Sequence, residues 1–147
     1  MAKATVEDAE LILHLYELRT ETIMRKARAF IVGEFWPQSA DDVANLVASF
    51  GTQENAYFRQ VIGYWDMAVS FVARGALSEE LFADSAGEFF FTYAKLFPHI
   101  SKVREGSPNF MRRLEEFVNS SKDYQERVAT AAKNIARVSA TRAGKSS

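Results

Sequence analysis

Residues 82–97 read FADSAGEFFFTYAKLF, and their spacing predicts a helix with a broad aromatic face. Adjacent helical side chains lie about 100° apart, so three consecutive phenylalanines cannot share one face. Phe89 and Phe90 fall on one core stripe, whose other members are Phe82, Ala86, Tyr93, Leu96 and Phe97. Phe91 falls on the polar side, between Glu88 and Lys95. We expect Phe91 either to be covered by a neighbouring helix of the same chain or, if exposed, to mark an interface.

Helical signals continue on both sides of this segment. Three prolines and seven glycines leave few breaks in 147 residues, which favours long helices over short strands. Caps, glycines and prolines divide the chain into these predicted helices: 5–36, 40–50, 53–74, 81–97 (with a restart allowed at Ser85), 99–105, 108–119 and 121–140. We therefore predict an all-α fold, a single-domain helical bundle of six or seven helices with a long first helix and an aromatic-rich core. This domain covers residues 1–140, and a flexible basic tail follows at 141–147.

Local cap motifs set several of these boundaries. Thr5 with Asp8 three residues later is a variant of the capping box, and Ser39 precedes Asp42 with the same spacing. Ser107 followed by Pro108 predicts a helix that begins with proline at its first position.

The first predicted helix carries two apolar stripes. The main stripe is Ile12, Tyr16, Ile23, Ala27, Phe30 and Ile31, and the second is Leu11, Leu15 and Leu18. A helix of this length measures about 45 Å, whereas a chain of this size has a radius of gyration of about 15 Å. The helix must therefore span the domain, bend or overhang. The second stripe needs a partner, which is either the last helix or a second copy of the protein.

Composition restricts the class of protein. The formal charge is −1, so nucleic-acid binding by a polycationic surface is not expected, although residues 122–147 carry six basic and two acidic side chains. There is no cysteine, hence no disulfide framework and no thiolate site. The N-terminal residues do not resemble a secretory signal, and no apolar stretch approaches the ~18 residues of a transmembrane segment. These features predict a soluble, cytoplasmic protein.

Catalytic and cofactor signatures are missing from the sequence. Only His14 and His99 are available as imidazoles, and neither follows a glutamate at the spacing of a helical di-iron site. Neither a phosphate-binding glycine loop nor a nucleophile elbow is present. We predict no catalytic residue, no metal site and no cofactor, and we favour a protein that is not an enzyme.

Two sets of residues remain candidates for ligand binding. A pocket between the aromatic helices would be built from Tyr64, Trp65, Tyr93, His99 and Arg104. An anion site would use Arg104 and Arg112 near the helix start predicted at Pro108, because free backbone N–H groups and arginines bind phosphate or carboxylate.

Residues 57–117 carry a resemblance to a known family. They combine an aromatic helix, the turn sequence GALSEEL at 75–81, and a second aromatic helix that ends in Pro98 and a basic segment. This pattern resembles a bacterial family, domain of unknown function 4760. The resemblance implies an all-helical fold and assigns no activity.

Three functional hypotheses follow. The first is a non-enzymatic helical module for protein–protein interaction or self-association, with an interface at Phe91, Leu11, Leu15 and Leu18. The second is a small-ligand or anion binder that uses the pocket residues above. The third is contact between the basic tail and nucleic acid or a membrane surface.

Overall fold

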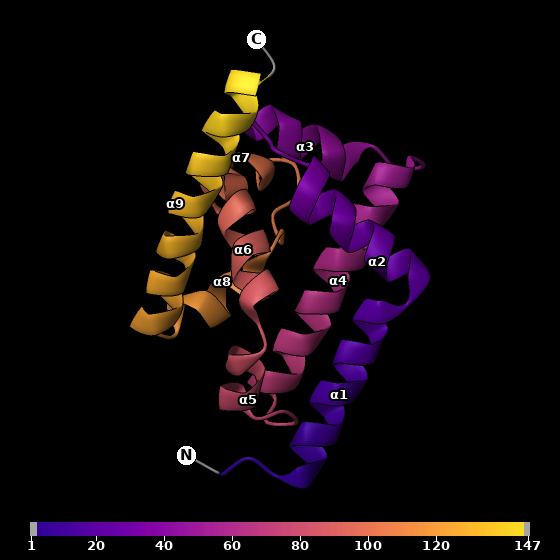
Figure 1. Cartoon of the computed structure of the whole chain (residues 1–147), viewed down its shortest axis with the longest axis vertical. Helices are drawn as coiled ribbons and strands as arrows, with labels where there is room; N and C mark the ends of the chain where they lie inside the picture. Colours follow the sequence, from indigo (N-terminus) through magenta and orange to yellow (C-terminus); the bar gives the residue numbers. More distant parts are fainter. Residues whose placement is uncertain (1–2, 146–147) are drawn as a thin grey trace.

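The computed structural model describes residues 3–145, which form helices and no strand. In chain order the elements are α1 (Val6–Thr20), α2 (Thr22–Ala29), the π-helix η1 (Phe30–Glu34), α3 (Ala40–Ala48), α4 (Gln53–Ala73), α5 (Glu79–Asp84), α6 (Gly87–Leu96), the 3-10 helix η2 (Phe97–His99), α7 (Ile100–Val103), α8 (Arg112–Asn119) and α9 (Lys122–Lys145). In Figure 1, α6 lies between α9 on one side and α4 on the other, with α1 beyond α4 at the opposite edge from α9. The predicted all-α fold is confirmed.

Most of the predicted caps are present. The Thr5 hydroxyl accepts the Asp8 N–H at 3.1 Å, and the Asp8 carboxylate accepts the Thr5 N–H at 2.8 Å. Ser39, Thr52 and Ser78 cap α3, α4 and α5 by accepting backbone N–H groups in the same way. Each cap pairs a donor that the first turn of a helix would otherwise leave unsatisfied.

The long first helical segment bends. At Glu21 the backbone is extended, with φ −62° and ψ 142°, and the Glu21 carboxylate caps α2 by accepting the Met24 N–H at 3.0 Å. The π-helix η1 follows α2 without interruption and ends at Glu34. Of the three possibilities that the length allowed, the chain adopts the bend, visible where α1 meets α2 in Figure 1.

Two boundaries near the C-terminus differ from the prediction. The expected helix start at Pro108 is wrong: residues 108–111 form turns, Met111 adopts a left-handed φ of 56°, and α8 begins only at Arg112. Helix α9 continues to Lys145, beyond the expected end near Ala140. Of the predicted tail, residues 146–147 lie outside the described part of the chain.

The core is an aromatic cluster between α4, α5, α6 and α8. The Trp65 ring lies 5.7 Å from that of Phe89, and Phe89 lies 5.7 Å from Phe117, centroid to centroid. Phe82 contacts all three of these rings. Offset and edge-to-face contacts of this kind add stabilisation to the area that the rings bury. The predicted aromatic-rich core is therefore confirmed.

The assignment of stripes on the first helix needs correction. Leu15, placed on the second stripe, is 5% exposed, whereas Tyr16 and Ile23 of the main stripe are 59% and 47% exposed. The last helix does not cover the leucines, because α9 packs against α6 and α8 across the molecule from α1. Leu15 lies instead beside Tyr64 of α4, whose hydroxyl donates to the Leu15 carbonyl at 2.7 Å. The bend at Glu21 prevents one face from continuing along the whole segment.

Helix α6 departs from its predicted stripe at two positions. Phe97 is 51% exposed and stacks on Tyr93 rather than entering the core, while Lys95 on the expected polar side is 3% exposed. Phe91 is half-buried against Trp36, with ring centroids 6.4 Å apart. Phe91 is thus covered in part by its own chain, through the loop that follows η1.

This difference between neighbouring phenylalanines is measurable. Phe89→Ala removes a fully buried ring from the aromatic cluster and should lower the free energy of unfolding by about 3–5 kcal/mol. Phe91→Ala removes a half-buried ring and should lower it by about 1–2 kcal/mol. Urea denaturation followed by circular dichroism compares the two variants. Equal losses would contradict the placement of Phe91 outside the core.

Candidate functional site

Tyr64 and Trp65 are occupied by contacts within the protein. The Tyr64 hydroxyl accepts from Arg19 Nε at 3.1 Å, and the Arg19 guanidinium lies 4.7 Å from the centre of the Trp65 ring. Burial raises the pKa of Tyr64. The cavity beside these side chains has a volume of about 20 Å³, which accommodates about one water molecule. In this part of the predicted pocket, Arg19 of α1 packs against Tyr64 and Trp65 of α4, so these side chains hold the two helices together.

Tyr93 and Arg104 lie in a second region, near α8. Arg104 Nη1 donates to Glu115 Oε1 at 3.1 Å and Arg104 Nε donates to the Phe110 carbonyl at 2.9 Å. Burial, with the nearby Glu115 charge, raises the pKa of Tyr93 to about 12. The structure therefore places Tyr93 near the charges of Arg104 and Glu115, whereas Tyr64 and Trp65 contact Arg19.

The remaining predicted ligand residues do not extend that cluster. Arg112 is exposed, and its Nε donates to the Pro108 carbonyl at 3.1 Å within the turn before α8. His99 is half-buried at the end of η2. Within residues 3–145, no group of three or more acidic or histidine side chains could hold a metal ion. The same residues contain no helix long and apolar enough to cross a membrane.

The predicted interface residues lie on separate faces. All three leucines lie on α1. Leu15 is buried and Leu11 is half-buried, whereas Leu18 is exposed and borders a shallow hollow with Met67. Phe91 lies on α6, and in Figure 1 that helix is separated from α1 by α4. The four residues therefore do not form one continuous surface.

Lys95 is the buried charge that the sequence did not reveal. Its Nζ donates to the carbonyls of Ile31 at 2.7 Å and Val32 at 3.1 Å, and it lies 3.7 Å from the centre of the Trp36 ring. The guanidinium of Arg142 lies 5.2 Å from the same ring. Burial, with the Arg142 charge adding to it, lowers the pKa of Lys95 to about 7. No local pattern indicates this site, because its carbonyl partners are more than sixty residues away.

An open groove of about 880 Å³ lies between α5, α6 and α9. Its floor is aromatic and consists of Phe90, Phe91 and Tyr124. Arg127 fixes one wall, because its Nη1 donates to the Ala83 carbonyl at 2.8 Å and its guanidinium lies 4.0 Å from the centre of the Phe90 ring. Tyr124 stacks on Phe117 at 4.6 Å between ring centroids, which holds the first turn of α9 against the core. The groove is therefore built on well-packed elements.

The groove carries an excess of negative charge. Its lining includes four exposed carboxylates, those of Glu80, Asp84, Asp123 and Glu126, against the single half-buried guanidinium of Arg127. Burial and the neighbouring Glu79 carboxylate raise the pKa of Tyr124 to about 12, so its hydroxyl stays neutral at physiological pH. An aromatic floor with an acidic rim attracts cationic groups, which interact with both carboxylates and ring faces.

Residues 3–145 therefore form an all-helical fold with a broad, acidic, aromatic-floored groove. The family model Domain of unknown function (DUF4760) matches residues 4–121, and the chain belongs to that family. No curated protein and no solved structure matches the chain. The match covers α1–α8 and stops one residue before α9, so one wall of the groove lies outside the matched segment.

The lowered pKa of Lys95 gives a pH dependence with a definite sign. Between about pH 7 and its ordinary value of 10.5, the unfolded chain binds a proton at Lys95 that the native protein does not bind. The free energy of unfolding should therefore rise with pH across this window, by about 1.4 kcal/mol per unit from this group. Lys95→Met should lack that rise in denaturant titrations at pH 6.5, 7.5, 8.5 and 9.5.

Lys102→Met serves as the control, because Lys102 is exposed and its partner Glu105 raises its pKa. This variant should keep the pH dependence of the unmodified protein. If Lys95→Met also keeps it, the amine titrates normally in the folded state and the assignment is wrong.

Proposed function

We propose that this domain is a non-enzymatic docking module whose groove between α5, α6 and α9 binds a basic amphipathic helical segment of a protein. The proposal is supported by one observation: the open groove of about 880 Å³ has both an aromatic floor and four carboxylates on its rim. An amphipathic helix that lies in such a groove places its apolar face on Phe91, the half-buried ring of the floor. Its lysines or arginines then face Glu80, Asp84, Asp123 and Glu126.

The rim charges give selectivity and rate of association more than binding strength. Exposed ion pairs contribute little each, about 0–1 kcal/mol, and are screened by salt. Apolar contact with the floor supplies the main stabilisation, and the carboxylates select a basic partner over an acidic one. The predicted complex is therefore salt-sensitive, with an affinity that depends on the apolar residues of the ligand helix.

The alternative functions receive less support. A small ligand at Tyr64 and Trp65 would have to fit a cavity of about 20 Å³. A cytoplasmic location is part of the proposal, because a chain without cysteine keeps its fold in a reducing compartment. Contact of the basic end of α9 with nucleic acid or a membrane surface stays a prediction.

Fluorescence anisotropy with a labelled amphipathic peptide of lysines and leucines tests the groove. The double variant Asp84→Asn/Glu126→Gln should weaken binding by at least fivefold at 50 mM salt, and the difference should shrink at 300 mM salt. The matched control is Glu10→Gln/Glu17→Gln, which removes the same charge from exposed positions on α1. If both double variants weaken binding equally, the peptide responds to net charge and the groove is not the site.

A further inference from the structure

Helix α9 carries a charge gradient along its exposed face. Six exposed residues lie within about 80° of one another around the helix axis: Asp123, Glu126, Thr130, Lys133, Arg137 and Thr141. The first two are acidic, and the fourth and fifth are basic. The helix dipole accounts for Asp123 in the first turn, but not for Arg137, which lies eight residues before the end of α9.

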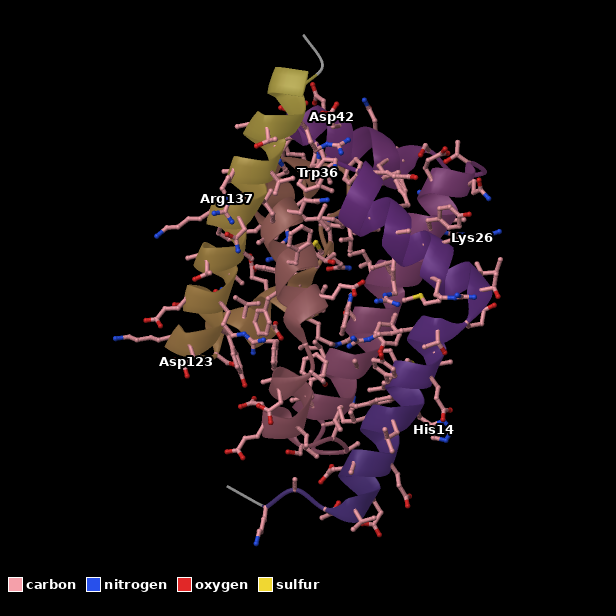
Figure 2. All side chains as sticks on the ribbon, in the orientation of Figure 1. His14, Lys26, Trp36, Asp42, Asp123 and Arg137 are labelled. Carbon is pink, nitrogen blue, oxygen red and sulfur yellow. The ribbon has the colours of Figure 1, made fainter. Side chains whose placement is uncertain are left out.

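The acidic end of this face lines the groove and the basic end does not. Asp123, Glu126 and Thr130 line the groove, whereas Lys133 and Arg137, on the same face of the helix, do not. Figure 2 labels Asp123 in the acidic part of this face and Arg137 in its basic part. At 1.5 Å per residue these two positions are about 21 Å apart along the helix. The protein therefore presents both an acidic groove and a basic helical segment.

We propose that the occupant of the groove is helix α9 of a second copy of this chain, packed antiparallel to the first. This inference rests on the function proposed above and names the partner of the same groove. An antiparallel arrangement centred between Thr130 and Lys133 places Glu126 of each copy opposite Arg137 of the other. Asp123 then faces Thr141 and the basic end of the opposite helix.

Two-fold symmetry makes each of these contacts occur twice. The interface is isologous, so one self-complementary face is sufficient and the assembly closes at two copies. Each α9 lies beside its own groove and contacts the groove of the other copy. The overlap from residue 123 to residue 141 is about 28 Å long, which extends over most of α9.

Charge reversal tests both the partner and the register. Sedimentation equilibrium of the full chain between 5 and about 500 μM should give a dimer for the unmodified protein. Glu126→Arg and Arg137→Glu should each weaken dimerisation at least tenfold, because each places two like-charge pairs across the two-fold axis. The double variant Glu126→Arg/Arg137→Glu should restore the affinity to within threefold, because every reversed acid meets a reversed base.

Two controls separate this result from unfolding and from net charge. Both positions changed in these variants are solvent-exposed, so circular dichroism and thermal unfolding should match those of the unmodified chain. Glu17→Arg changes the net charge as Glu126→Arg does, from an exposed site on α1, and should leave the dimer unchanged.

The outcomes distinguish this inference from the function on which it rests. A monomer at 500 μM, or a double variant that stays as weak as the single ones, overturns the second copy as the occupant. If such a protein still binds the lysine–leucine peptide through Asp84 and Glu126, the groove keeps its function with a different protein partner. A protein that neither dimerises nor binds the peptide overturns both proposals.

Discussion

The buried amine of Lys95 is the contact on which the arrangement of the N-terminal third depends. A π-helix such as η1 leaves carbonyls at its end without an intrahelical donor, and Lys95 pairs those of Ile31 and Val32. An unpaired buried carbonyl costs about 1–3 kcal/mol. The same amine nitrogen faces the ring of Trp36, which also contacts Arg142 of α9. One side chain on α6 thus connects η1, the loop after it and, through Trp36, the end of α9.

Arginines repeat this arrangement at other helix ends. Arg28 donates to the Arg19 carbonyl at the end of α1, Arg19 donates to the Ser85 carbonyl after α5, and Arg127 donates to the Ala83 carbonyl within α5. A cation near the C-terminus of a helix pairs its free carbonyls and interacts favourably with its dipole. Arg28 also forms a two-bond pair with Glu88, at 2.8 and 2.7 Å. Arginine side chains of one helix therefore pair backbone carbonyls near the end of another. These contacts stabilise the relative positions of the helices around the aromatic core.

Local signals predicted the helices well, because caps act over three residues. Thr5 and Ser39, the caps identified from the sequence, each bond within their own first turn, so spacing alone identifies them. The failures involve contacts between distant residues. A helical projection places Lys95 on a polar face because the projection carries no information about η1. It also assigns Tyr16 and Ile23 to one stripe, because it assumes a straight helix and the chain bends at Glu21. The groove escaped prediction for the same reason, since its floor and walls come from three helices that are separate in sequence.

The family match covers the part of this site that lies on α5 and α6. Residues 4–121 include Phe90, Phe91 and Phe117 but not α9. Tyr124 covers Phe117 and Arg127 covers Phe90, so α9 turns an aromatic face of α6 and α8 into the floor of a groove. The same helix supplies two of the four rim carboxylates and the basic face at its other end. Because α9 supplies Tyr124, two rim carboxylates and the basic face, the binding proposed for this site requires that helix.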